Sequence, residues 1–339
     1  MTVMINPESW YRQVEEEIVE PERAIVDTHF HLWRNHPPFI DYLLEDLWAD
    51  TGSGHNVEQM VFLECQSEYL TSGSESMRPV GETRFVGEAA ARAAATGKTR
   101  IGAIVGTADL LLGAAVEEVL QAQIVAGVGL FRGIRYSAAW DASDQIANAS
   151  SDPGSDLLSD RRFREGFARL TPLGLSYDCW LYHTQLGALA DLARVFPETI
   201  VVANHLGCVL GSGPYHGRRD EIFEEWRRGI AALSECPNVI VKLGGLAQPA
   251  NGFGWEARDR PPTSDEFAST YSRYYLHAIE QFGPERCTFE SNFPVDRMSV
   301  SYHVLWNAFK KMVADFSEAE KELMFRGTAT RVYGLDPVG

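Results

Sequence analysis

Short apolar segments alternate with longer amphipathic segments along the whole chain. The apolar segments are continuous rather than alternating, and they consist mainly of Val, Ile, Leu, Phe and Ala. They lie near residues 24, 59, 100, 130, 175, 199, 238 and 286. A short continuous apolar run is typical of a parallel strand that is buried on both faces. The pattern therefore predicts eight buried strands.

Most of the segments between these strands have the apolar spacing of amphipathic helices. Examples are residues 81–98, 111–127, 186–199, 219–237 and 264–285. Strands that alternate with helices indicate βαβ units and a parallel sheet. Eight strands suit a closed barrel better than an open sheet, and no GxGxxG motif follows the first strand to favour the open form. We therefore predict an α/β protein with a (β/α)8 TIM-barrel fold.

The predicted connections differ in length on the two sides of the barrel. Segments before strands are short, whereas several segments after strands are long and rich in Gly, Pro, Ser and Asp. The long segments are residues 65–82, 137–160, 206–220 and 245–264. In a barrel they share the face formed by the carboxyl ends of the strands, where sites are built. We predict extended loops on that face of one barrel domain, residues 23–339, after an N-terminal extension, residues 1–22.

Composition restricts the partners that we expect. The chain has 30 Lys and Arg residues against 47 Asp and Glu residues, a formal charge of −17. A field of this sign repels phosphate backbones and anionic membranes, so we expect a small-molecule substrate and neither nucleic acid nor a membrane. The N-terminal residues lack the pattern of a signal peptide, and we expect a cytoplasmic protein. The composition leaves the oligomeric state open, a homo-oligomer included.

An HxH motif, His29 and His31, follows the first apolar segment. Residues i and i+2 of an extended segment point the same way, so both imidazoles can face one ion or one substrate. Neutral imidazole is the commonest ligand of zinc-like ions. His183 follows the fifth predicted strand and His205 closes the sixth. Because the carboxyl ends of barrel strands converge, the four histidines predict one shared site.

The strings VDTHFHLW, NHLG and FESNFPVD resemble the amidohydrolase-2 group of the amidohydrolase superfamily, especially its lactonase-like metal-dependent TIM-barrel hydrolases. The resemblance extends from about residue 22 to about residue 335. It implies that His29, His31 and His183 bind one divalent metal ion, Zn²⁺ by the family pattern, or are metal-free equivalents of such ligands. It implies no organic cofactor, and it implies that His205 faces the substrate carbonyl.

One position departs from the family pattern. The family places an Asp after the eighth strand, where it binds metal and takes the proton of the attacking water, but this chain has Asn292 there. An amide cannot act as a general base near neutral pH, and it is a weaker metal ligand. Glu290, which we slightly favour, or Asp296 then acts as the base, or a histidine does so while Asn292 orients the water. The third interpretation is weak metal binding and a different reaction.

Other polar residues lie at or near predicted strand ends. Glu64 ends the second strand, Arg135 lies in the fourth and Lys242 in the seventh. Charged groups inside a barrel mouth are costly unless they are paired or used, so two interpretations stay open. They form internal ion pairs, or they bind substrate, with a guanidinium holding a carboxylate through two bonds. Tyr182 either donates to a substrate carbonyl or packs.

Together these residues favour a hydrolase that opens a lactone, or a related cyclic or simple ester, of a small substrate that carries a carboxylate. Water held by the histidines attacks the carbonyl, and a carboxylate takes the proton and returns it to the leaving alkoxide. Two alternatives stay open. One is a non-oxidative decarboxylase of an aromatic or unsaturated acid. The other is a barrel that binds a ligand without catalysis, which Asn292 keeps open.

Overall fold

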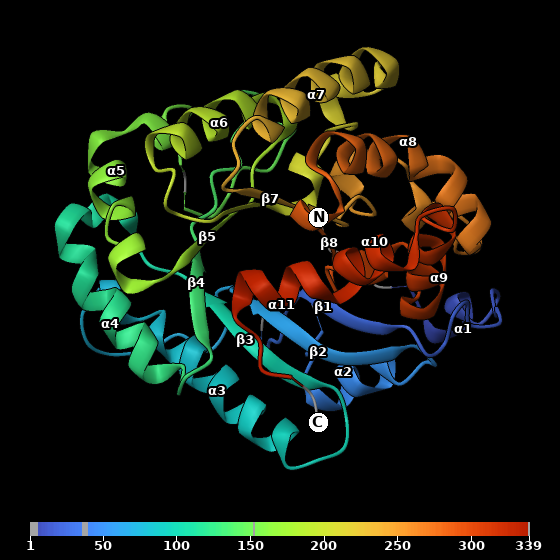
Figure 1. The fold of residues 1–339 in the computed structure, drawn as a ribbon, viewed down its shortest axis with the longest axis horizontal. Helices are drawn as coiled ribbons and strands as arrows, with labels where there is room; N and C mark the ends of the chain where they lie inside the picture. The colour runs from blue at the N-terminus through green and yellow to red at the C-terminus, as the bar shows by residue number, and fades with distance from the viewer. Residues whose placement is uncertain (1–5, 36–39, 152, 338–339) are drawn as a thin grey trace.

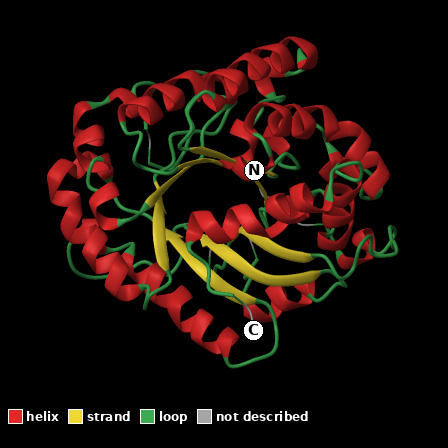
Figure 2. Cartoon of the chain, viewed as in Figure 1, coloured by secondary structure: helices red, strands yellow, loops and turns green. Residues whose placement is uncertain are grey.

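The computed structural model describes residues 6–35, 40–151 and 153–337. Eight parallel strands form one sheet in the order of the chain, curved into a barrel with helices around it (Figures 1 and 2). The strands are β1 (Ala24–Phe30), β2 (Asn56–Leu63), β3 (Arg100–Gly106), β4 (Phe131–Arg135), β5 (Ser176–Cys179), β6 (Val201–Ala203), β7 (Val239–Leu243) and β8 (Cys287–Phe289). Each overlaps one predicted apolar segment, so the predicted (β/α)8 barrel is confirmed.

The longer helices follow the amphipathic segments and bury one apolar face, as α6, α7 and α8 do. Thr263 begins the longest helix with a capping box, in which its hydroxyl accepts from the Glu266 amide while the Glu266 carboxylate accepts from the Thr263 amide. The helices are α1 (Glu8–Tyr11), α2 (Leu44–Thr51), α3 (Val80–Ala94), α4 (Val116–Ala126), α5 (Arg161–Phe167), α6 (Leu186–Val195), α7 (Arg219–Ser234), α8 (Ser264–Phe282), α9 (Tyr302–Met312), α10 (Glu318–Glu322) and α11 (Thr328–Tyr333).

The barrel closes between its first and last strands through the chain that follows β8. The amide of Asn292 donates to the carbonyl of His29 over 2.9 Å, and the amide of His31 donates to the carbonyl of Phe293 over 2.9 Å. These bonds place the segment after β8 directly against the HxH motif. The motif itself spans the end of β1, since His29 lies within the strand and His31 follows it.

Helix α11 covers the amino end of the barrel. Val26, Val61 and Val105 face the lumen and form one apolar cluster with Val332 and Tyr333 of this helix. Figure 1 shows α11, drawn in red, running across the opening of the strand ring. Because one end is closed by this packing, the carboxyl end with its long loops is the end that is left for a site.

The described part of the N-terminal extension packs against the barrel. The indole nitrogen of Trp10 donates to the carbonyl of Arg258 over 2.8 Å. The side chain of Asn307 on α9 accepts from the Val19 amide and donates to the Glu17 carbonyl. The division into extension and barrel domain stays a prediction. Within the described residues, no helix has both the length and the apolar character needed to cross a membrane.

Candidate active site

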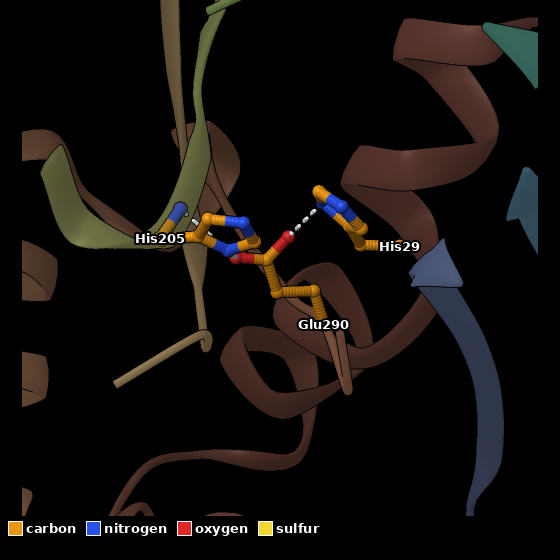
Figure 3. A group of neighbouring side chains, drawn as sticks. All are labelled: His29, His205 and Glu290. Atoms are coloured by element: carbon orange, nitrogen blue, oxygen red, sulfur yellow. Dashed lines mark hydrogen bonds and ion pairs between the residues drawn. The ribbon is translucent and has the colours of Figure 1, made fainter. Parts of the chain in front are cut away.

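His29, His205 and Glu290 meet at the carboxyl ends of β1, β6 and β8 (Figure 3). Nδ1 of His205 lies 2.7 Å from Oε1 of Glu290, and the amide of His205 donates to the same oxygen over 2.9 Å. Nδ1 of His29 lies 2.7 Å from Oε2 of Glu290. All three residues are buried, and one ligand atom from each lies within 4.8 Å of the others. The Glu290 carboxylate therefore contacts both imidazoles, one with each oxygen.

The backbone around this cluster is bent to present His205. His205 and Leu206 have φ angles of 56° and 53°, in the left-handed region that non-glycine residues rarely adopt. Such strained backbone persists only where surrounding contacts hold it, and it gathers at functional sites. Two glycines after β7 make the room: a Cβ on Gly244 would lie 2.4 Å from Cγ of Glu290, and one on Gly245 would lie 2.0 Å from Nδ1 of His205.

Electrostatics favour an ionised Glu290 carboxylate and neutral rings for His29 and its neighbour His31. Burial raises the pKa of Glu290, but the His205 ring, its amide and the charge of Lys242 lower it more, and the net shift is downward. Burial, followed by the positive charge of Lys242, holds the pKa of His29 well below its usual value. Burial and the charge of Arg135 do the same for the pKa of His31. His29 and His31 are therefore neutral at pH 7.

Arg135 and Glu64 form a buried ion pair at the edge of this cluster. Nε of Arg135 donates to Oε1 of Glu64 over 2.8 Å, and Nη2 donates to the Glu64 carbonyl. Nη1 of Arg135 lies 3.2 Å from Nε2 of His29. The ion-pair interpretation therefore holds for these two residues, and substrate binding by them stays a prediction.

His31 lies beside His29 with a different backbone partner. Its ring centroid is 4.9 Å from that of His29 and 5.8 Å from the ring of Trp33. Nδ1 of His31 lies 2.8 Å from the carbonyl of Leu63, which fixes a hydrogen on this nitrogen because a carbonyl only accepts. The rings of His29, His31 and His205 are thus neighbours, as expected, with His205 4.5 Å from His29.

Asn292 and Asp296 bind each other. Nδ2 of Asn292 donates to Oδ1 of Asp296 over 2.7 Å, and the amide of Ala247 donates to Oδ2 over 3.2 Å. Burial raises the pKa of Asp296 to about 8. Asp296 thus ties the loop after β8 to the segment after β7. Glu290, rather than Asp296, supplies the ionised carboxylate of the cluster.

His183 and Tyr182, which follow β5, have partners outside the cluster. Nδ1 of His183 accepts from the Leu210 amide over 3.3 Å, and its ring meets Tyr215 edge-on at 5.4 Å. Burial lowers the pKa of His183 to about 4, and its Nε2 is buried without a hydrogen-bond partner. The Tyr182 hydroxyl donates to the carbonyl of Ala147. The packing interpretation fits Tyr182, and metal binding by His183 stays a prediction.

Lys242 lies inside the barrel rather than at its mouth. Its Nζ is 2.8 Å from Oδ2 of Asp178 and donates to the carbonyl of Thr28 over 2.7 Å, and it is fully buried. Asp178 also accepts from the Asn204 side chain over 2.9 Å and from the Tyr333 hydroxyl. Asp178 was not among the residues predicted from the sequence. A lone Asp within an apolar strand was the available signal, because a buried carboxylate requires partners.

The cluster fits a divalent ion in the kind of donors it offers. Two imidazoles and an ionised carboxylate are the protein ligands of many catalytic zinc sites. Nδ1 of His29 and Oε2 of Glu290 are buried and close, yet their geometry is not that of a hydrogen bond. A cation shared by the two atoms would satisfy both. Among the described residues, His29, His205 and Glu290 are the group whose ligand atoms lie within 4.8 Å of one another, and metal binding by His31 and His183 stays a prediction.

A cavity of about 620 Å³ opens beside the Arg135–Glu64 pair, which is the size of a small-molecule site. Eight of its described lining residues carry a hydroxyl group and three carry a carboxylate, and no Lys, Arg or His occurs among them. The lining residues are Glu64, Gln66, Tyr69, Ser74, Glu75, Ser76, Pro79, Thr107, Asp109, Leu112, Tyr136, Ser137, Ser150 and Ser151. They all lie in the segments that follow β2, β3 and β4.

Residues 26–335 match the family model of the amidohydrolases. The chain belongs to the amidohydrolase family. This amidohydrolase is 31% identical over 333 residues to the uncharacterized protein y4mH of Sinorhizobium fredii, an alignment that covers 91% of this chain and 98% of that protein. It is 25% identical over 317 residues to the L-fucono-1,5-lactonase of Burkholderia multivorans, covering 91% of this chain and 96% of that one.

Solved structures share the fold of this amidohydrolase. A zinc-bound amidohydrolase from Burkholderia multivorans superposes with a TM-score of 0.71 at 22% identity, covering 93% of this chain and 100% of that one. A 5-carboxyvanillate decarboxylase from Novosphingobium aromaticivorans superposes with a TM-score of 0.58 at 12% identity, covering 93% and 97%. Proteins of this fold thus catalyse more than one reaction, so the reaction of this chain has to be inferred from the residues of its site.

Proposed function

We propose that this amidohydrolase hydrolyses the ester bond of a lactone, or of a related ester, at the His205–Glu290 pair. The bond between Nδ1 of His205 and the ionised Glu290 carboxylate is the observation that carries the proposal. When the His205 ring carries a single hydrogen, this bond places that hydrogen on Nδ1 and leaves the lone pair on Nε2, where a water proton can be taken. The 25% identity to a lactonase over nearly the whole chain supports this bond type.

The reaction follows from that pair. Water attacks the carbonyl carbon, its proton goes to Nε2 of His205, and Glu290 stabilises the imidazolium that forms. The carbon–oxygen bond of the ring then breaks, and His205 returns the proton to the leaving alkoxide, which gives a hydroxy acid. The Arg135 guanidinium supplies fixed positive charge near the developing oxyanion. A divalent ion held by His29 and Glu290 would supply carbonyl polarisation and a more acidic water, and it would leave the lone pair of His205 free to act as the base.

The cavity favours an uncharged, hydroxyl-rich substrate. Its serine, threonine and tyrosine hydroxyls and its carboxylates accept or donate to substrate hydroxyls, whereas the carboxylates repel a negative charge. This departs from our sequence-based expectation of a carboxylate-bearing substrate. The guanidinium of Arg135 is already held by Glu64, a residue of the cavity lining.

Proton release during ring opening tests the proposal. A pH-stat assay over neutral sugar lactones, pyrone carboxylates and simple esters should show turnover, strongest for neutral hydroxylated lactones. His205→Asn and Glu290→Gln should each lower kcat/KM by about 10²–10⁴-fold, the usual contribution of acid–base groups. His277→Gln on α8, outside the cluster, should change it little. Release of CO2 from an acid panel, or ligand binding without turnover, would contradict the proposal.

A further inference from the structure

All three nitrogens of the Arg135 guanidinium contact buried groups, and one of them contacts His29. Its Nη1 lies 3.2 Å from Nε2 of His29, while Nε and Nη2 both donate to Glu64. The side chains of Arg135 and Glu64 are only 9% and 7% exposed, and His29 is fully buried. Contacts with protein groups therefore fix the position of the guanidinium, which is almost completely shielded from solvent.

The chemistry of this contact settles which nitrogen of His29 carries the hydrogen. A guanidinium only donates, so Nε2 of His29 must accept and its lone pair is used. The one hydrogen of the neutral ring then lies on Nδ1, which faces Glu290. Nε2 of His29 is thus bonded to Arg135, whereas Nδ1 carries the hydrogen and lies beside Glu290 without the geometry of a hydrogen bond.

A metal ion needs a lone pair on one of these nitrogens. Binding at Nε2 would replace the guanidinium directly. Binding at Nδ1 would move the ring hydrogen to Nε2, where it would point at the donor of Arg135. Either route breaks the contact between Arg135 and His29 and brings a second positive charge close to the first.

We propose that Arg135 and a divalent cation compete for His29, so that Arg135 controls whether this site holds a metal ion. While the contact is intact, the guanidinium supplies the positive charge that an ion would bring. The inference concerns cation binding by the cluster, and it does not depend on whether the substrate is a lactone.

Zinc affinity, measured without substrate, tests the competition. Protein purified without a His-tag and stripped by a chelator is titrated with Zn²⁺ by calorimetry, and bound metal is counted by emission spectroscopy after dialysis. Arg135→Met should bind Zn²⁺ at least about tenfold more tightly than the wild type, the lower range for residues that tune a metal site through its ligands. Adding His29→Gln should abolish the gain.

Two further variants separate competition from simple charge repulsion. Arg135→Lys keeps the charge but lacks the fork that reaches both Glu64 and His29, so it should also bind Zn²⁺ more tightly. If it binds as weakly as the wild type while Arg135→Met gains, charge repulsion explains the effect and the proposal is wrong. Arg132→Met, on the same strand with its guanidinium bonded to the Tyr333 carbonyl, should leave the affinity unchanged.

A charge-balanced variant serves as the control for a folding defect. Arg135→Met leaves Glu64 buried without its partner, so Glu64→Gln/Arg135→Met is titrated beside it, and circular dichroism and Tm establish that each variant is folded. A folded double variant that binds Zn²⁺ no better than the wild type overturns the proposal, and a tenfold gain supports it.

Discussion

At the scale of single residues, the site depends on what is missing as much as on what is present. Gly245 has a φ angle of 67°, and a Cβ there would lie 2.0 Å from Nδ1 of His205. Only glycine leaves room for the ring to reach Glu290 from a backbone of this conformation. The Gly244-Gly245 pair after β7 is thus part of the machinery that orients His205, although neither residue has a functional group.

Replacing Gly245 with Ala should therefore displace the ring of His205. We expect a loss of about 2–4 kcal/mol in the free energy of unfolding, from the left-handed backbone and from overpacking. The kcat/KM for lactone hydrolysis should fall by at least about tenfold, because ring position decides proton transfer. Urea unfolding and the pH-stat assay measure the two effects.

Gly217→Ala is the matched control for this substitution. Gly217 has a φ angle of 79°, and no atom lies within 4 Å of the place that the added methyl group would take. Only the backbone cost of about 1–2 kcal/mol therefore applies there. Equal losses for the two variants would show that the approach to His205 has no energetic effect.

At the scale of elements, His55 ties the start of β2 to α9. Its Nε2 donates to the carbonyl of His303 over 3.0 Å, and its Nδ1 accepts from Nζ of Lys310 over 2.8 Å. Lys310 also donates to the carbonyls of Val19 and Glu20, which brings the N-terminal segment into the same network. Burial lowers the pKa of His55 to about 4 and that of Lys310 to about 8.

These shifts predict how stability depends on pH. The unfolded chain binds a proton at His55 near pH 6.5, whereas the folded chain resists until about pH 4, so stability falls as pH drops through this window. Lys310 loses stability in the same way as pH falls from 10.5 to about 8, and its contribution stays constant below that pH. In urea unfolding from pH 7.5 to 4, His55→Gln should flatten the decline by up to roughly 3 kcal/mol. An unchanged slope would contradict this assignment.

At the scale of the whole molecule, the Lys242–Asp178 pair joins distant parts of the barrel. Lys242 of β7 reaches the Thr28 carbonyl of β1, and Asp178 of β5 accepts from Tyr333 of α11. Both charges are completely buried. A buried pair of this kind adds little net stability. Removing one partner, however, leaves the other charge unpaired in the protein interior, which solvates it poorly.

We therefore expect Lys242→Met to lower the free energy of unfolding by about 3–5 kcal/mol. Lys242→Met/Asp178→Asn should recover part of the loss, because no unpaired charge remains. Arg161→Met removes an exposed pair with Glu165, whose side chains are 84% and 47% exposed, and should cost at most about 1 kcal/mol. Thermal unfolding of the variants measures these losses. If Lys242→Met lowered the free energy of unfolding no more than Arg161→Met does, the buried pair would not have the predicted role.

The sequence by itself determined the barrel, the end of the barrel that carries the site and most of the chemical groups there. Strands and helices follow from apolar periodicity, which is a local property of the chain. His29 and His31 were visible because alternate residues of a strand share a face, and His205 because it closes a strand. Glu290 was singled out because this chain has Asn292 where the family pattern has an Asp.

The tertiary structure alone decided which of these groups meet. Spacing gives the strand end on which a side chain lies, but its partners depend on side-chain torsions and on loops that are distant in sequence. His183 thus turned to the Leu210 amide, Lys242 turned inward to Asp178, and Arg135 turned to His29. Hydrogen bonding inside a buried site is satisfied collectively, so no single segment of the chain encodes it.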